Sequence, residues 1–235
     1  MFIYENVVKS RAIQNIFSDR ASLVLRAFLR QPQKRWVIPE LCREGLSGGL
    51  ASGVLNRAEH QGYLYRRRKG RHSYSQIARK ELLLKDWCLA YRFDRNIHTT
   101  YLYPGGEFLK VFTRRFAQDR VDYALTLFSA SRLISPYVRE DRHFVYLNKQ
   151  GEAFWKYLEQ LEREQLIYKL ARGGNVCFAA PFYRSSVFRD SRVVKRYRVV
   201  SNLQLYLDLM TFAPSGPEEA KHLEALFKKR GQTLV

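Results

Sequence analysis

Cysteine is scarce in this sequence, with only Cys42, Cys88 and Cys177 among 235 residues and no C-x-x-C pair. Three widely spaced cysteines disfavour a disulfide framework or a zinc cluster and fit a reducing compartment. No stretch approaches the 18 uninterrupted apolar residues that a transmembrane helix needs. The first residues, Met1 to Glu5, also lack the basic lead and apolar core of a signal peptide. We therefore expect a cytoplasmic protein that does not contact a membrane.

The signatures of common enzyme classes are missing too. The sequence contains no G-x-x-x-x-G-K-[ST], G-x-G-x-x-G, G-x-S-x-G or H-E-x-x-H motif. It has neither the Gly-Ser and Asp-x-Asp pairing of nucleotidyl transfer nor the spaced Asp and Glu-x-Lys of metal-dependent nucleases. Its five His and three Cys never fall at metal-ligand spacing. We therefore predict no catalytic residues, no metal site and no cofactor.

Acidic residues are few relative to basic ones. The chain has 41 Lys and Arg against 22 Asp and Glu, a net charge of +19, while 46% of its residues are apolar, enough for a folded core. The excess is concentrated between Arg57 and Lys80, where eight basic residues accompany one acid, Glu59. A surplus of this size predicts a polyanionic partner, nucleic acid before a membrane surface.

Three helices are expected before residue 62. The first begins at Ser18 or Asp19 and stops at Pro32, and the second has Pro39 in its first turn and ends at Gly45. Ser47 caps the third helix, which ends at Gly62. The expected buried positions of the first and third helices are Leu23, Val24, Ala27 and Phe28, then Leu50, Val54, Leu55 and Ala58.

The apolar period changes to two after Gly62, which predicts a β-hairpin from residue 63 to 75 that turns at Lys69-Gly70. Three helices and a basic hairpin within about sixty residues are typical of a winged helix-turn-helix. We therefore assign residues 1–80 to a DNA-binding domain of this type, residues 81–95 to a linking helix and residues 96–235 to a mixed α/β domain. The expected fold class is α+β.

The third helix presents a polar face opposite its apolar stripe. On it, Ser52, Asn56 and Arg57 are the candidates for reading bases in the major groove, where Asn pairs with adenine and Arg with guanine. Alternation along the hairpin sends Arg66 and Arg68 to one side and Arg67 to the other. The candidates for the DNA backbone or the minor groove are Ser47, Gly48, Arg66, Arg67, Arg68, Lys69 and Arg71.

The second half alternates strand-like and helical segments. Strands are expected near 98–103, 143–147, 166–170, 176–180 and 193–200. Helices are expected near 107–118, 128–134, 152–165, 203–212 and 217–230. Gly-Gly and Pro-containing turns at 105–106, 135–136, 173–174 and 214–217 separate them.

Several segments resemble a known family. They are the run from Tyr123 to Pro136, the segment from Gly174 to Pro181, Val-Ser-x-x-Gln-x-Tyr-Leu-Asp-Leu from Val200 to Leu209, and Gly-x-x-Glu-Ala from Gly216. With the basic N-terminal domain in front of them, they are similar in order to the AbiEi family of antitoxins and transcriptional regulators of type IV toxin–antitoxin systems. Asn202 departs from the proline usual there, and the Pro214–Pro217 turn replaces an expected Arg-Gly turn.

The resemblance implies an N-terminal winged helix that represses its own promoter as double-stranded DNA, and a C-terminal domain with the antitoxin activity. It also implies a nucleotidyltransferase-like toxin as the functional counterpart, counteracted without a stable complex. Tyr206 and Asp208 lie in the family-like run and are the antitoxin candidates, although packing and capping explain them equally well. Repressors of this type commonly occupy two half-sites as homodimers, but the sequence shows no heptad repeat or dimer stripe.

Other classes of function remain open at this point. A nuclease or nucleotidyltransferase with a diverged active site would also use a basic domain for targeting, and Arg-rich loops bind RNA as well as DNA. The second domain is alternatively an interaction module for a protein partner.

Overall fold

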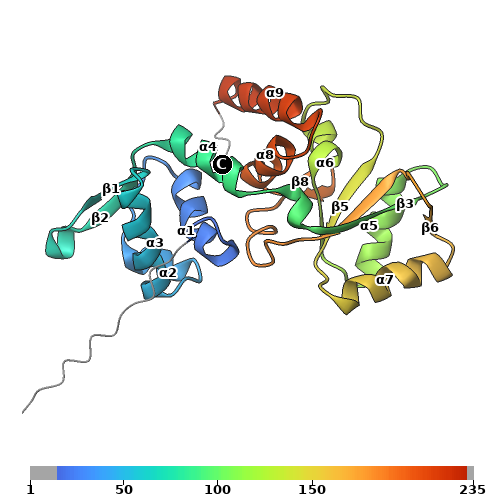
Figure 1. The fold of residues 1–235 in the computed structure, drawn as a ribbon, viewed down its shortest axis with the longest axis horizontal. Helices are drawn as coiled ribbons and strands as arrows, with labels where there is room; N and C mark the ends of the chain where they lie inside the picture. The colour runs from blue at the N-terminus through green and yellow to red at the C-terminus, as the bar shows by residue number, and fades with distance from the viewer. Residues whose placement is uncertain (1–14, 232–235) are drawn as a thin grey trace, which may run out of the picture. The chain divides into compact units, whose positions relative to one another are not determined.

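The computed structural model describes residues 15–231, and the expectation about Met1 to Glu5 concerns residues outside this range. The chain divides into two compact units, of which the first ends at Leu82 and the second begins at Leu83 (Figure 1). Helices and strands mix in the order expected for the α+β class, which is confirmed. Among the described residues, none of the helices has both the length and the apolar character needed to cross a membrane.

The first unit contains three helices and a two-stranded sheet. Its elements are α1 (Asp19–Arg30), α2 (Ile38–Arg43), α3 (Gly48–His60), β1 (Leu64–Arg67), the 3-10 turn η1 (Gly70–His72) and β2 (Tyr74–Ile77). The predicted cap of α3 is present, because Ser47 Oγ accepts a hydrogen bond from the Leu50 amide at 3.2 Å. The chain leaves α3 through Gly62, whose φ of +77° favours glycine.

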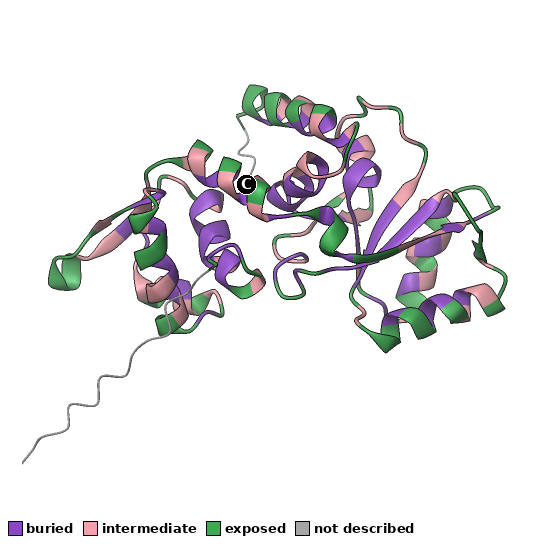
Figure 2. Cartoon of the chain, viewed as in Figure 1, coloured by how far each residue is buried: buried purple, intermediate pink, exposed green. Residues whose placement is uncertain are grey.

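The core of the first unit follows the predicted stripes with two shifts (Figure 2). Leu23 is partly exposed, and Leu25 takes its place among the fully buried residues of α1. The prediction that Leu50 is buried in α3 is also wrong. Leu50 lies in the first turn after the cap and is partly exposed, and Ala51 is buried instead. Both shifts leave the polar face of α3 where it was expected.

The hairpin differs from the prediction in its turn. Strands β1 and β2 pair antiparallel with Leu64 opposite Ile77 and Arg67 opposite Tyr74, so the predicted two-residue turn at Lys69-Gly70 is wrong. Residues 68–73 form a longer loop, and Arg71 lies in η1 rather than in a strand. Ser73 stabilises this loop, because its Oγ accepts from the Lys69 amide at 2.9 Å and donates to the Gly70 carbonyl at 2.7 Å.

The second unit is built on a seven-stranded mixed sheet with the order β6-β3-β7-β5-β4-β9-β8. Strands β5 and β7 are parallel, as are β4 and β9, and the other neighbours are antiparallel. The strands are β3 (Ile97–Leu102), β4 (Tyr123–Leu125), β5 (His143–Leu147), β6 (Tyr168–Lys169), β7 (Val176–Ala180), β8 (Arg192–Val194) and β9 (Tyr197–Val199).

Helices cover both faces of this sheet (Figure 1). On one face, Phe112 of a helix packs against Phe178 of β7, with ring centroids 5.7 Å apart. On the other face, Phe144 of β5 meets Phe128 and Phe212 at 6.0 and 5.3 Å. The helices are α4 (Lys80–Ala90), α5 (Phe108–Gln118), α6 (Leu127–Ile134), α7 (Glu152–Arg163), α8 (Asn202–Met210) and α9 (Gly216–Lys229), with a 3-10 turn η2 (Phe93–Arg95).

Two strand predictions in this unit need correction. The segment 193–200, expected as one strand, is the hairpin β8–β9, which turns at Lys195 and Arg196, both with positive φ. Strand β4 was not expected, because a strand of three residues is too short to show a period of two. The other strands and the helices lie within a few residues of their predicted positions.

The predicted linking helix contributes to the core of the second unit. From Leu83 onward α4 belongs to this unit, and Trp87 is fully buried, with its Nε1 donating to the Tyr183 hydroxyl at 3.4 Å. Residues 83–90 therefore pack as part of the α/β unit.

The two family-like segments that begin at Val200 and Gly216 contain residues that cap α8 and pack α9 against α8. Ser201 caps α8, since its Oγ accepts from the Gln204 amide at 3.1 Å. At Gly216, the first residue of α9, a Cβ atom would lie 2.2 Å from the Leu209 carbonyl oxygen, so only glycine allows this approach of α9 to α8. Glu219 and Ala220 are buried in the next turn of α9.

Candidate nucleic-acid interface

The polar face of α3 carries the three predicted base-reading residues. Asn56 and Arg57 are exposed, and Ser52, one turn earlier, is partly buried. Ala51, Val54 and other small or branched residues hold the opposite face of the helix in the core. The helix therefore presents an amide and a guanidinium side by side to solvent.

Two arginines of the hairpin reach this face of α3. Arg66 donates to Asn56 Oδ1, and Arg68 Nη2 lies 3.5 Å from the same oxygen. Arg68 also donates from both Nη atoms to the carboxylate of Glu59, with Nη1 2.9 Å from Oε1. Arg66 and Arg68 thus share one side of the hairpin, as strand alternation predicts, and we call the four residues Asn56, Glu59, Arg66 and Arg68 the α3–wing cluster.

The charges of the α3–wing cluster perturb one another. The hydrogen bonds from Arg68 lower the pKa of the Glu59 carboxyl. Partial burial, followed by the neighbouring Arg68 charge, lowers the pKa of Arg66. Glu59 therefore compensates part of the positive charge of the hairpin next to Asn56.

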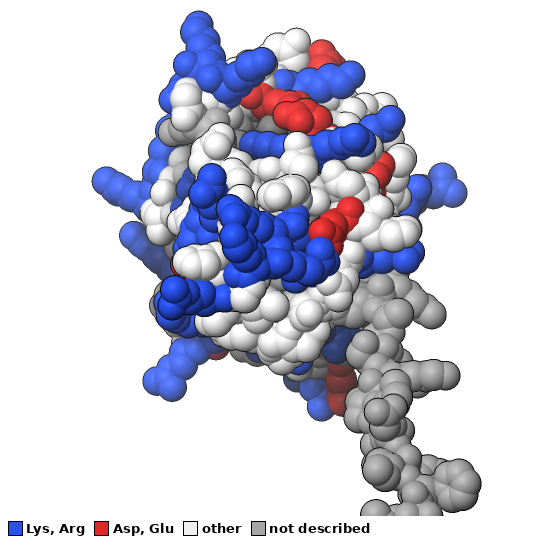
Figure 3. Space-filling model, turned by 90° about the vertical axis from the view of Figure 1, so that its left-hand side faces the viewer, with Lys and Arg blue, Asp and Glu red and all other residues white. Residues whose placement is uncertain are grey.

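The loop of the hairpin holds the uncompensated charge. Arg67, Lys69 and Arg71 are exposed, and no carboxylate of residues 15–231 lies within ion-pair distance of them. Figure 3 shows Lys and Arg side chains gathered on the face of the molecule that carries the hairpin. This loop is the part of the described chain where an anionic backbone would meet several cations at once.

A groove of about 480 Å³ lies between the hairpin and the segment that enters α2. One wall is apolar and contains Val37, Ile38 and Pro39. The other wall carries the arginines of the hairpin together with Ser73, Tyr74 and Ser75. The groove therefore combines a hydrophobic side with a cationic side, which suits the sugar and phosphate of a nucleic-acid strand.

The residues predicted to contact phosphate at the start of α3 are exposed, but the side chain of one of them already has a hydrogen-bond partner. Ser47 is exposed, but its Oγ already accepts the capping hydrogen bond. Gly48 and its neighbour Gly49 are exposed, and a Cβ at Gly49 would meet nothing within 4 Å. The fold therefore does not require glycine at 49, and the open backbone there leaves room for a close approach by a ligand.

Tyr206 and Asp208, the two antitoxin candidates, have different surroundings. Asp208 is fully buried and accepts hydrogen bonds from Tyr91 at 2.5 Å, Tyr146 at 3.1 Å and Gln204 at 2.8 Å. Thr126, which precedes α6, donates to its other oxygen. Tyr206 is half-buried, and burial together with nearby Glu224 raises its pKa to about 12. Asp208 therefore joins the end of α4, the start of α6, β5 and α8 inside the second unit and is not available at its surface.

Burial raises the pKa of Asp208 from 3.8 to about 6, against the lowering effect of its hydrogen-bond donors. The folded protein consequently holds this proton more tightly than the unfolded chain does. Its stabilising contribution is complete below about pH 4 and is lost as the pH rises through about 6. A shift of this size corresponds to about 3 kcal/mol.

We expect this contribution to appear as a pH-dependent difference between the protein and its Asp208→Asn variant. Relative to the variant, the free energy of unfolding of the unchanged protein falls by about 3 kcal/mol between about pH 4 and pH 7. Urea unfolding followed by circular dichroism at several pH values measures the difference. A difference that stays constant over this range contradicts the assignment.

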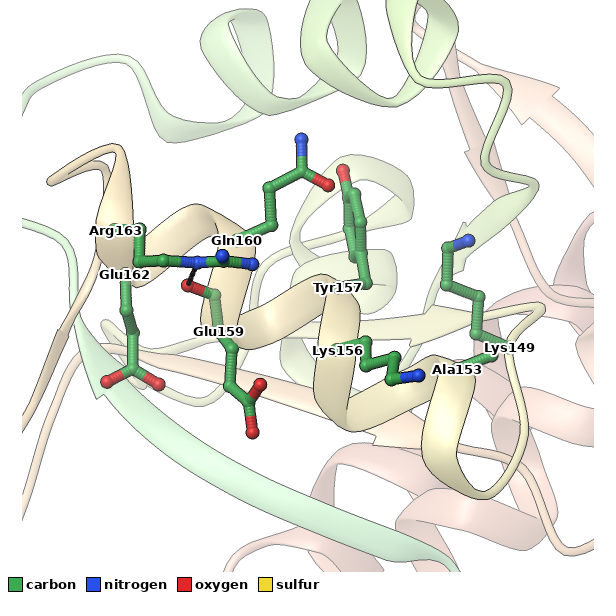
Figure 4. Close-up of a pocket in the computed structure, with 8 residues that line it drawn as sticks. All are labelled: Lys149, Ala153, Lys156, Tyr157, Glu159, Gln160, Glu162 and Arg163. Carbon is green, nitrogen blue, oxygen red and sulfur yellow. Dashed lines mark hydrogen bonds between the residues drawn. The ribbon is translucent and has the colours of Figure 1, made fainter.

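A second hollow, of about 860 Å³, follows α7 in the second unit (Figure 4). Its lining mixes cations and anions, and the Arg163 Nε donates to the Glu159 carbonyl at 3.4 Å. The residues that line it are Lys149, Ala153, Lys156, Tyr157, Glu159, Gln160, Glu162 and Arg163. Because both signs of charge alternate along one helix face, the hollow has the character of a solvated surface and favours no ligand class.

Histidine and cysteine are dispersed in the structure as well. Across residues 15–231, no three His, Cys, Asp or Glu side chains are grouped to hold a metal ion. His143 stacks on Phe108 with ring centroids 4.3 Å apart, and burial lowers its pKa to about 4. Its imidazole is therefore a packed neutral ring at physiological pH.

The contacts within the α3–wing cluster were not foreseen from the sequence. Glu59 stood out as the single acid between Arg57 and Lys80. Its position on α3, one turn after Asn56, is a signal that it faces the same hairpin arginines. The pairing itself depends on how the hairpin folds back on α3, which periodicity does not encode.

One family model matches the chain, over residues 76–224, and its description is "Transcriptional regulator, AbiEi antitoxin, Type IV TA system". The match covers more than half of the sequence, from the end of β2 into α9, and begins after α1, α2, α3 and β1. Neither the curated proteins nor the solved structures that were compared with the chain gave a match.

Proposed function

The chain belongs to the AbiEi family of transcriptional regulators and antitoxins of type IV toxin–antitoxin systems, and from this membership we propose that it represses its own promoter through a winged helix-turn-helix in residues 1–80. In this proposal α3 enters the major groove of double-stranded DNA and the β1–β2 hairpin is the wing. The family also supports a toxin encoded beside it as the functional counterpart. We assign the antitoxin activity to the α/β unit, acting on a nucleotidyltransferase-like toxin without a stable complex.

The observation that carries the DNA-binding proposal is the convergence of α3 and the wing. Arg66 of β1 and Arg68 of the adjoining loop extend to the exposed amide of Asn56, so α3 and the basic hairpin form one continuous surface. The charge of the loop beyond them supplies phosphate contacts, which position a protein on DNA without reading its sequence. Asn56 and Arg57 supply hydrogen bonds to base edges, which carry the sequence preference.

The test compares two duplexes of equal length by fluorescence anisotropy at about 150 mM salt. One contains the DNA upstream of this gene, and the other is a shuffled sequence. We expect the upstream duplex to bind about 10³-fold more tightly or better. Equal binding would leave only a general affinity for polyanions and would contradict the repressor proposal.

The Asn56→Ala variant tests the role of α3 in the same assay. Loss of one bidentate base contact is worth about 1–3 kcal/mol, so the preference for upstream DNA should fall about 5- to 160-fold. Binding to the shuffled duplex should change little, because Asn56 is not a phosphate contact in this proposal. Gln31→Ala, which removes an exposed amide at the end of α1, is the matched control and should keep the full preference.

A further inference from the structure

The hairpin is extended by a third paired segment. Trp36 forms an antiparallel bridge with Ser75 of β2, with both backbone hydrogen bonds at 2.8 Å. Trp36, Ser75 and Leu64 are buried and therefore face the core of the first unit. Successive side chains alternate between the two faces of a sheet. Arg66, which stands opposite Ser75, lies on the same side as these buried residues. Five residues that alternate with this side lie on the opposite one, which we call the outer face of the wing: Arg35, Tyr65, Arg67, Tyr74 and Gln76.

Two tyrosines lie side by side on the outer face. Tyr65 is 55% exposed, and Tyr74 is partly exposed. Their ring centroids are 6.2 Å apart, as expected for diagonal neighbours on adjacent strands. Both rings thus remain on the solvent side of the sheet, although the core of the same unit contains other aromatic residues.

Cations surround these rings. The Arg35 guanidinium lies 4.9 Å from the centre of the Tyr74 ring, and Arg67 stands directly opposite Tyr74 in the register. Both arginines are exposed, and neither has an ion-pair partner in the described range 15–231. The outer-face positions of the three paired segments contain no acidic side chain.

We propose that the outer face of the wing binds single-stranded nucleic acid, with unpaired bases stacked on Tyr65 and Tyr74 and phosphates held by Arg35 and Arg67. Stacking requires the flat face of a base, which a duplex hides within its own stack, whereas an unpaired strand offers it. Interleaved aromatic and basic side chains on a sheet surface are the combination that single strands recognise. This surface does not include the α3–wing cluster, whose arginines point to the other side of the hairpin, although it shares Arg67 with the loop cations and Tyr74 with the groove described above.

The experiment measures anisotropy of labelled 12-nucleotide oligo(U) RNA and oligo(dT) DNA with the full chain at about 150 mM salt. Each alanine replacement, Tyr65→Ala or Tyr74→Ala, should weaken binding of the single strands about 5-fold to 100-fold. Tyr65→Phe and Tyr74→Phe keep the ring and should bind within about two-fold of the unchanged protein. Thermal unfolding of each variant checks that the fold is kept.

The upstream DNA duplex is titrated in parallel, so the outcome does not depend on the repressor proposal. Duplex binding should change less than two-fold in the Tyr65→Ala variant, because Tyr65 does not line the groove between the hairpin and the segment that enters α2. Equal affinity for both single strands identifies a stacking surface, and preference for oligo(U) identifies RNA as its ligand. Single-strand binding that survives both alanine replacements, or that is absent, overturns the proposal; in the latter case the exposed tyrosines fit a protein contact instead.

Discussion

Replacement of Arg67, Lys69 and Arg71 by glutamine should weaken binding to the upstream duplex about 10²-fold at about 150 mM salt. Each cation that neutralises one phosphate releases condensed counterions and contributes about 0.9 to the slope of log affinity against log salt. Loss of three contacts should therefore make the negative slope shallower by about 2.7. If the two proteins bind equally at about 1 M salt, where these contacts contribute little, this change in slope gives an affinity about 10²-fold lower at about 150 mM salt. These three residues are suited to the test because they are exposed and have no ion-pair partner within residues 15–231, unlike Arg68, which is bound to Glu59.

A matched variant separates a local contact from a general effect of charge. Lys221→Gln, Lys228→Gln and Lys229→Gln together remove the same charge from exposed positions of α9. This variant should keep the salt slope of the unchanged protein. Two results would contradict phosphate binding by the wing. One is an equal loss of duplex affinity in the wing variant and the α9 variant, and the other is an unchanged salt slope in the wing variant. Titrations at four or more salt concentrations provide these slopes.

Asp208→Ala should lower the free energy of unfolding of the second unit by about 3–5 kcal/mol. The replacement leaves the Tyr91 and Tyr146 hydroxyls, the Thr126 hydroxyl and the Gln204 amide without their shared acceptor in a dry core. It also opens a cavity among four structural elements. Changes of this size are large relative to the whole stability of a domain, so the variant should accumulate poorly in cells.

Urea unfolding followed by far-ultraviolet circular dichroism measures the effect of Asp208→Ala. Asp94→Ala is the control, since Asp94 forms an exposed ion pair with Arg92 near the same network, and exposed pairs contribute little to stability. An Asp208→Ala protein as stable as this control would contradict the structural role of the carboxylate. Toxin neutralisation measured with the better-folded Asp208→Asn variant then separates an antitoxin role from loss of the fold.

Patterns within single elements were readable from the sequence. The stripes of α1 and α3 and the cap at Ser47 rest on local rules of spacing and hydrogen bonding. Two exceptions in the second unit depend on how strands pair. Strand β4 is defined by its neighbours β5 and β9, and the segment 193–200 turns at Lys195 because it pairs with itself.

The candidate site shows the same division. The sequence identified Asn56, Arg57 and the basic hairpin as a set, because charge density and the polar face of α3 are visible in one dimension. It did not identify Glu59 as the partner of Arg68 or Asp208 as the centre of a buried network. Asp208 and its donor Tyr91 are 117 positions apart. A single sequence contains no rule that brings such residues together.

In the mode of DNA binding proposed above, the α3–wing cluster has a consequence for how the protein would search along DNA. Asn56 Oδ1 is held by Arg66 before any base is met, so bringing the amide to a base edge first requires that this contact open. On DNA of arbitrary sequence, the loop cations would contact phosphates while Asn56 keeps its hydrogen bond to Arg66. The protein would then slide along the DNA without forming or breaking contacts to bases. Only a DNA site that provides new hydrogen-bond partners for both Asn56 and Arg66 would compensate for the loss of the hydrogen bond between them. In that mode, the cluster would separate rapid scanning of DNA from slow commitment to one site.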